Sequence, residues 1–105
     1  MAREKLLQDK CLTLLRGEGI YCLNLYGDGR SGKGKPDIIA CIDGKFIAIE
    51  LKVGNNDLRP DQLIHKRRIE RSGGTHFTIR SVDELKTAIR SVRDRKDNGN
   101  ERKRC

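Results

Sequence analysis

Apolar and polar residues alternate along this chain with two different periods. Leucine and cysteine recur every three or four residues near the N-terminus, which predicts an amphipathic helix over residues 3–16. A second helix is predicted over residues 60–72, because Pro60 suits a first helical turn and two glycines follow the segment. The residues Ser-Val-Asp-Glu beginning at Ser81 form a capping box, which predicts the start of a third helix.

Between these helices, alternation of polar and apolar residues or an enrichment in β-branched and apolar residues predicts four strands. They cover residues 20–26, 37–42, 45–53 and 75–80. The resulting order is helix, three strands, helix, strand, helix, which predicts an α/β sandwich built around a mixed sheet. At 105 residues the chain is long enough for one domain with a single modest core.

The second and third strands are joined by Asp43-Gly44, the strongest short signal for a two-residue hairpin turn. With these residues as the turn, Asp37 on one strand faces Glu50 on the other. Opposed side chains lie only about 4.5–5.5 Å apart at Cβ and like charges there destabilise a sheet, so a positive group should lie between them. Lys52 follows two residues after Glu50 and therefore shares its face of the strand.

Two facing carboxylates and a lysine form a candidate metal site. Carboxylate oxygens suit Mg²⁺ or Mn²⁺, and Mg²⁺ commonly takes one or two of them and leaves positions for water and a substrate phosphate. Lys52 would orient or deprotonate the attacking water, or neutralise charge that develops on a phosphate. The alternative is that Asp37 is an exposed residue at the start of a strand, with Glu50 and Lys52 forming a solvated, ion-paired edge.

The charge balance points to a polyanionic partner. The chain carries a net charge of +8, and clustered Lys and Arg gain affinity for nucleic acid by releasing counterions. Residues 93–105 hold six basic and three acidic residues and are expected to form a disordered basic tail, which leaves +5 on a single domain over residues 1–92. The candidate DNA contacts are cations of a glycine-rich loop and of the second helix: Arg30, Lys33, Lys35, Arg59, Lys66, Arg67, Arg68 and Arg71.

Several other functions are disfavoured. No apolar run is long enough to span a membrane and no secretory signal is recognisable, so we expect a cytoplasmic protein. The four cysteines lack C-x-x-C spacing, which disfavours structural zinc. Residues 27–33 nearly spell a P-loop, but Gly34 replaces the Ser or Thr that would hold Mg²⁺ and a strand follows, which argues against a nucleotide cofactor.

These motifs resemble the PD-(D/E)xK nuclease superfamily, and within it the VRR-Nuc (virus-type replication-repair nuclease) group. The likeness covers about residues 4–92 and rests on three segments: Gly34-x-Pro36-Asp37, Ile49-Glu50-Leu51-Lys52, and Leu58-Arg59-Pro60-Asp61-Gln62 at the head of the second helix. It implies an αβββαβα core of the restriction-endonuclease type, with a mixed sheet flanked by helices.

The same resemblance implies roles for individual residues. Asp37 and Glu50 would bind the metal together with the main-chain carbonyl of Leu51. Lys52 would be catalytic, and Gln62 would support Lys52 or the attacking water.

By the same likeness, Glu4 in the first helix would add an acidic group near the metal, with Glu18 as a rival for that place. The implied activity is that of a Mg²⁺- or Mn²⁺-dependent, structure-selective DNA endonuclease, which leaves 5′-phosphates and acts as a homodimer on branched DNA such as four-way (Holliday) junctions. Its setting would be a bacterial or phage-infected cell. Two alternatives stay open: a noncatalytic DNA-binding module on the same scaffold, and an exonuclease or restriction-type nuclease with the same core.

Overall fold

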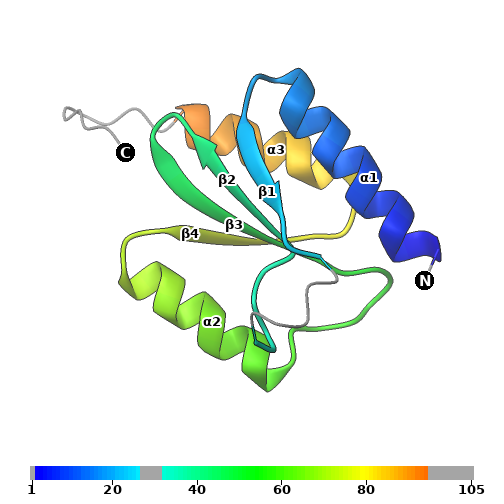
Figure 1. Cartoon of the computed structure of the whole chain (residues 1–105), viewed down its shortest axis with the longest axis vertical. Coiled ribbons are helices and arrows are strands. Elements are labelled where there is room, and N and C mark those ends of the chain that lie inside the picture. Colours follow the sequence, from blue (N-terminus) through cyan, green and yellow to red (C-terminus); the bar gives the residue numbers. More distant parts are fainter. Residues whose placement is uncertain (1, 27–31, 95–105) are drawn as a thin grey trace.

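The computed structural model describes residues 2–26 and 32–94 of the chain. Within them, three helices surround a four-stranded sheet (Figure 1). The helices are α1 (Ala2–Gly17), α2 (Pro60–Arg71) and α3 (Val82–Asp94). The strands are β1 (Tyr21–Asn24), β2 (Ile38–Ile42), β3 (Lys45–Leu51) and β4 (Thr75–Ile79). The predicted order of helices and strands is confirmed.

The sheet is mixed, as predicted, with the strand order β1-β2-β3-β4. β1 pairs antiparallel with β2, and β2 pairs antiparallel with β3. β4 runs parallel to β3, and α2 forms the crossover between these two strands.

The hairpin between β2 and β3 turns at the two predicted residues. Asp43 and Gly44 have φ angles of 51° and 80°, and a two-residue type I′ turn requires a positive φ at both positions. The turn fixes the register by pairing the strand residues on either side of it, and that register continues as far as Ile38 opposite Ile49.

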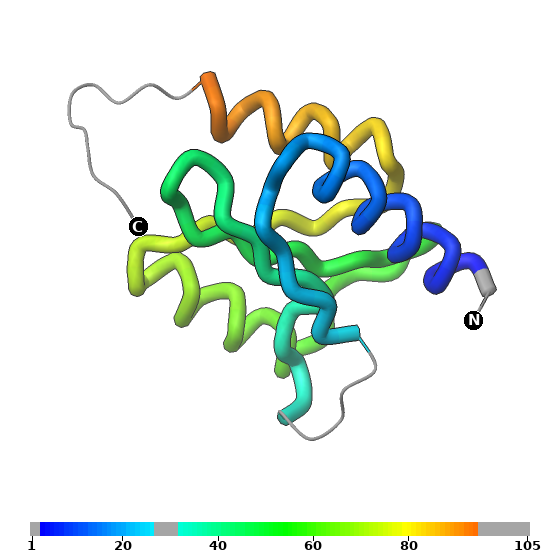
Figure 2. The backbone as a smooth tube through the Cα atoms, turned by 45° about the horizontal axis from the view of Figure 1, so that its top comes forward, coloured from blue at the N-terminus to red at the C-terminus, as the bar shows by residue number. Residues whose placement is uncertain are grey.

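The helices form two layers on opposite faces of the sheet. α1 and α3 lie side by side on one face, and α2 lies against β4 on the other (Figures 1 and 2). Alternate residues of β2 and β3 point into the layer under α1 and α3, where α3 contributes Leu85, Ile89 and Val92. The main core therefore lies on this side, and the opposite face of β3 is available to carry polar groups.

Capping and ion pairing define the ends of α3. The Ser81 hydroxyl accepts a hydrogen bond from the Glu84 N–H at 3.1 Å, in agreement with the predicted cap. At the other end α3 continues to Asp94, two residues beyond the predicted domain end at 92. Arg93 belongs to the folded domain because its guanidinium pairs with the Glu18 carboxylate at 2.7 Å. The predicted disorder from residue 95 onward lies outside the described residues.

Among the described residues, no helix combines the length and apolar character that crossing a membrane requires.

Candidate metal centre

The backbone at the start of β2 aims the Asp37 side chain at the end of β3. The Asp37 N–H donates to the Ile49 carbonyl at 3.0 Å, although the register pairs Ile49 with Ile38. Asp37 and Ile38 therefore both lie opposite Ile49. This arrangement is that of a β-bulge, which redirects the side chain of the extra residue. The Asp37 carboxylate accepts a hydrogen bond from the Leu51 N–H at 2.8 Å. The predicted direct pairing of Asp37 with Glu50 is therefore corrected to a bulged approach.

Glu50 lies on β3 with its side chain almost fully buried, at 3% exposure. One carboxylate oxygen, Oε2, accepts a hydrogen bond from Gln62 at 2.9 Å, whereas Oε1 has no hydrogen-bond partner among the described residues. Burial, reinforced by the charge of the adjacent Asp37 carboxylate, raises the pKa of Glu50 to about 8. Burial also raises the pKa of Asp37, against the opposing effect of the Leu51 N–H.

Lys52 supplies the positive charge that the acid pair was predicted to need. It follows the last residue of β3, and its N–H donates to the Ile79 carbonyl at 3.1 Å, which keeps the chain extended. Its side chain is 8% exposed, and its charge lowers the pKa of both Asp37 and Glu50. The charge of Arg59 also lowers the pKa of Glu50. The structure thus brings the predicted acidic and basic residues together.

Gln62 connects α2 to the acid pair. Its side-chain nitrogen donates to Glu50 Oε2, and its side-chain oxygen accepts a hydrogen bond from the Arg59 N–H at 2.9 Å, across the first turn of α2. Gln62 is 5% exposed, so it is not the surface polar residue that its place in a first helical turn would suggest. Its partner is Glu50, whereas the resemblance implied support for Lys52 or the water.

Gly34 sets the approach of the loop that leads to Asp37. It has a φ of 85°, and a Cβ added there would lie 2.5 Å from the Asp61 carbonyl oxygen and 3.0 Å from the His65 ring. Only glycine fits both the positive φ and this close contact. The contact seats the loop against the first turn of α2, from which Gln62 reaches Glu50.

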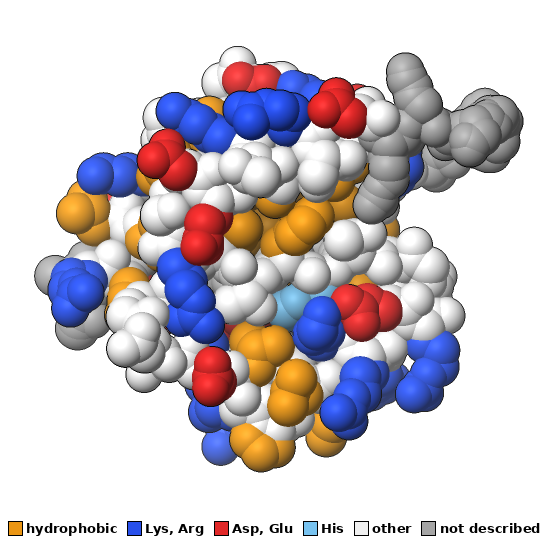
Figure 3. Space-filling model, turned by 180° about the vertical axis from the view of Figure 1, so that it is seen from behind, with side chains coloured by type: hydrophobic (Ala, Val, Ile, Leu, Met, Phe, Trp, Pro, Cys, Tyr) orange, Lys and Arg blue, Asp and Glu red, His pale blue; other side chains and the backbone are white. Residues whose placement is uncertain are grey.

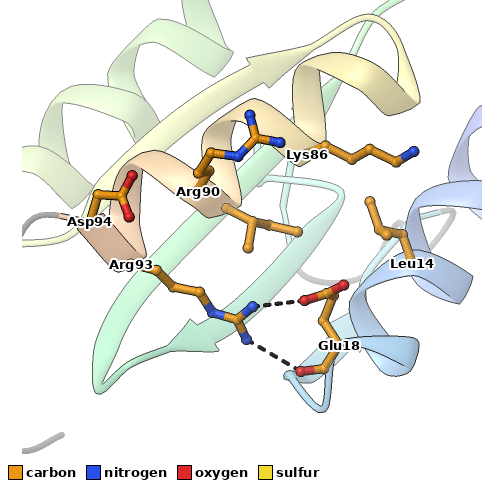
Figure 4. A pocket seen from close by; sticks show the side chains of 7 residues that line it. Leu14, Glu18, Lys86, Arg90, Arg93 and Asp94 are labelled. Carbon is orange, nitrogen blue, oxygen red and sulfur yellow. Dashed lines mark hydrogen bonds and ion pairs between the residues drawn. The ribbon is translucent and has the colours of Figure 1, made fainter.

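The two candidate helix-borne acids lie at opposite ends of α1. Glu4 accepts a hydrogen bond from the Tyr26 hydroxyl at 3.4 Å, and its charge contributes to the raised pKa of Asp37. Glu18 instead pairs with Arg93 beside α3, at the other end of the helix (Figure 4). Glu4 is therefore the acid on the Asp37 side, whereas Glu18 lies beside Arg93.

A polar cluster beside Glu4 was not predicted. Gln8, one turn further along α1, donates to the side-chain oxygen of Asn24, and that oxygen also accepts the Tyr26 N–H at 3.0 Å. Gln8 is 2% exposed. The available signal was a glutamine interrupting the apolar stripe of the helix, four residues after Glu4.

The predicted DNA contacts of the second helix lie on or next to α2, where Figure 3 shows Lys and Arg side chains gathered. Lys66 pairs with Glu70 at 2.7 Å and Arg59 pairs with Asp61 at 3.2 Å. Arg67, Arg68 and Arg71 are exposed on the helix. In the glycine-rich loop, Lys33 is exposed and Lys35 half-buried, while Arg30 lies outside the described residues.

The acid pair has the donor chemistry of a small divalent-cation site. The partnerless Glu50 Oε1 is a buried oxygen that a cation would satisfy. The N–H and C=O of a strand residue point the same way, so the Leu51 carbonyl faces Asp37 as its N–H does. No three His, Cys, Asp or Glu side chains of residues 2–26 and 32–94 converge on a metal-sized site, so Glu4 stays outside the set. Two carboxylates and a carbonyl suit Mg²⁺ or Mn²⁺.

A solved structure described as a VRR_NUC domain has the same architecture. It aligns over 84% of this chain and 95% of its own length, with a TM-score of 0.70 and 23% sequence identity. The chain has the fold of a VRR_NUC domain. The resemblance inferred from the sequence motifs is thereby confirmed at the level of the fold, as is the predicted mixed sheet flanked by helices.

Among the comparisons with known proteins, the likeness to a VRR_NUC domain comes from the comparison of structures. No protein-family model matches the chain, and no curated protein matches it either. At this level of identity the likeness establishes the architecture alone, so any activity must be argued from the residues of the chain itself.

Proposed function

We propose that this chain is a divalent-metal-dependent DNA endonuclease that hydrolyses phosphodiester bonds. The observation that carries the proposal is the pair of half-buried Asp37 and buried Glu50, with one Glu50 carboxylate oxygen unpartnered among the described residues and buried Lys52 beside the pair. Burying the charged groups of Glu50 and Lys52 costs stability, and carboxyl groups with perturbed pKa values gather at active sites. The name of the similar structure, a VRR_NUC domain, gives independent support for a nuclease.

Each residue near the acid pair has a role in this proposal. Asp37, Glu50 and the Leu51 carbonyl hold Mg²⁺ or Mn²⁺, which when bound would activate water and neutralise charge on the scissile phosphate. Lys52 orients or deprotonates the attacking water, or neutralises the negative charge that develops on the phosphate. Gln62 keeps Glu50 in a fixed orientation, as outer partners of metal ligands do.

The substrate we propose is branched DNA such as a four-way junction, bound by a homodimer in the cytoplasm. Two symmetric cuts need two active sites and each chain offers one, which favours a two-fold dimer. The exposed arginines of α2 and the net charge of +8 favour contacts to phosphates around the site.

Cleavage assays on four-way junction, flap and linear duplex DNA with Mg²⁺ test the proposal. Glu50→Ala and Lys52→Ala should each reduce the cleavage rate at least ~100-fold while DNA binding persists. Asp9→Ala and Lys5→Ala are the matched controls, because these residues form an exposed acid–base pair on α1. Both controls should cut at the wild-type rate.

Wild-type rates in Glu50→Ala or Lys52→Ala would refute the assignment. Tight, salt-sensitive DNA binding without cleavage in Mg²⁺ or Mn²⁺ would identify a noncatalytic DNA-binding module instead. Preferential degradation from ends, or cutting at one sequence of linear duplex, would identify the exonuclease or restriction-type alternative.

A further inference from the structure

One half of the sheet face that carries Glu50 has no described helix over it. α2 packs on this face against β4, whereas α1 and α3 occupy the opposite face (Figure 1). Within residues 2–26 and 32–94, no helix therefore covers the side chains of β1 and β2 that point the same way as Glu50, and Tyr21 and Leu23 among them are exposed. This surface is a candidate for contact with another molecule.

The register shows that this surface is apolar across three strands. Tyr21, Cys41 and Phe46 form one row across β1, β2 and β3, and Leu23 and Ile39 stand in the next row. We call these five residues the open sheet face. Tyr21 is 71% exposed, and Leu23 and Phe46 are each 47% exposed, values that are high for large apolar side chains.

Charge distinguishes between possible occupants. None of the five side chains of the open sheet face is charged, and DNA binding relies on Lys and Arg contacts to phosphates. Two copies of a chain with net charge +8 repel wherever their cations meet, so they associate best where neither carries one. Both arguments favour a second copy of this chain over nucleic acid.

The face also carries a projection and a hollow on either side of β2. Tyr21 projects from the edge strand β1, and a hollow of about 560 Å³ lies beside Phe46, with His65 and Arg68 of α2 on its wall. In the Tyr21, Cys41, Phe46 row, Cys41 stands between the two. If two copies stack with these faces together, a two-fold axis that runs between them along β2 would place each Tyr21 at the hollow of the partner. Both copies then use the same surface, so the contact forms a closed dimer.

The surface available is of the size that an interface core requires. A buried aromatic side chain covers about 150–250 Å², so the exposed parts of Tyr21, Leu23 and Phe46 offer roughly 300 Å² per copy. A standard interface buries about 800 Å² per partner, with an apolar core inside a polar rim. The flank of α2 that borders the hollow would supply part of that rim.

From these observations we infer that the open sheet face is the homodimer interface, with Tyr21 inserted into the hollow beside Phe46 of the second copy. This deepens the proposed function, because the face is continuous with the acid pair: Phe46 and Glu50 lie on the same side of β3. The dimer would therefore fix where the second acid pair lies relative to the first.

Sedimentation equilibrium of the full chain tests the inference. At a protein concentration of about 10 μM, the wild type should sediment with twice the monomer mass of 11.9 kDa. Leu23→Lys should raise the dissociation constant of the dimer at least ~100-fold, and Tyr21→Ala at least ~30-fold, as for an interface anchor. Leu6→Lys is the matched control, since Leu6 is 55% exposed on α1, and it should leave the dimer unchanged.

Thermal unfolding followed by circular dichroism should show that all three variants fold. A wild type that stays monomeric up to about 100 μM, roughly a hundredfold above a micromolar dissociation constant, would overturn the inference. So would a dimer that neither Leu23→Lys nor Tyr21→Ala weakens. Loss of DNA binding in Leu23→Lys, with a monomeric wild type, would assign the face to nucleic acid.

The outcome is independent of the proposed nuclease activity. A dimer broken by Leu23→Lys that never cuts DNA would support the interface and refute the nuclease. A monomer that cuts DNA would refute the interface and leave the nuclease standing. Glu50→Ala, which should abolish cleavage, should sediment as the wild type does.

Discussion

In metal-free protein, raising the pH should lower stability through Glu50. The pKa of this group is about 8 in the folded protein against 4.5 for the ordinary carboxyl, because burial and the Asp37 charge favour the protonated form. A raised folded-state pKa gives stability that is complete below the unfolded value and is lost as the pH rises through the folded value. With ~1.4 kcal/mol for each pKa unit, the free energy of unfolding should fall by about 2–3 kcal/mol between pH 5.5 and 7.5.

Urea unfolding in the presence of a chelator, at fixed protein concentration, measures this loss. With m near 1–3 kcal/mol per molar urea, the midpoint should move down by roughly 1–2 M between the two pH values. Glu50→Gln should remove most of that movement, because its amide does not titrate. Glu70→Gln is the control: Glu70 is an exposed acid paired with Lys66, and its pKa is lowered.

Adding Mn²⁺ without the chelator should restore the stability of the wild type at pH 7.5, because a cation binds the deprotonated carboxylates. Glu50→Gln should gain much less. An equal pH dependence in wild type and Glu50→Gln would refute the reasoning, since the titrating group would then lie elsewhere.

Three further outcomes are expected. Gly34→Ala should lower the free energy of unfolding by about 2–4 kcal/mol in a denaturant titration, because it combines a strained φ with a backbone clash. Gly32→Ala should lower it by only about 1 kcal/mol, because Gly32 has a φ of 100° but no described residue would lie within 4 Å of the added Cβ. Gln62→Leu should slow cleavage about 10–100-fold and weaken Mn²⁺ binding in calorimetry, through loss of its bond to a carboxylate; unchanged Mn²⁺ affinity would count against a positioning role. Arg67→Ala and Arg71→Ala should each reduce the slope of log affinity for duplex DNA against log salt by about 0.9, if each contacts one phosphate, and an unchanged slope would remove that residue from the DNA surface.

The fold could be predicted because its signals are local. Helical and strand periodicity are properties of neighbouring residues, and the Asp43-Gly44 turn fixed the register of the hairpin from Ile42 and Lys45 onward. That register alone predicts that the acid pair and Lys52 lie together at one end of β3. The same reasoning could not foresee the bulge at Asp37, which arises from one shifted backbone hydrogen bond.

Parts of the candidate site depend on packing and could not be predicted from the sequence. Glu4 lies in the first turn of α1 and Glu18 directly follows its last residue, and only the docking of α1 against the sheet and α3 shows which one lies near Asp37. Gln62 occupies a first helical turn, where its side chain serves its own helix in most proteins, yet here it also reaches Glu50. Arg93 looked like part of a tail because its partner is 75 residues away in the sequence.

The central claim is that Asp37 and Glu50 together hold a divalent cation. An anomalous difference map from a crystal soaked in Mn²⁺ near pH 7.5 tests it most directly. A peak is expected within about 2.0–2.4 Å of one oxygen of each carboxylate, with the Leu51 carbonyl as a further ligand. A map with no peak between the two side chains, or with the only strong peak at another place on the molecule, would contradict it.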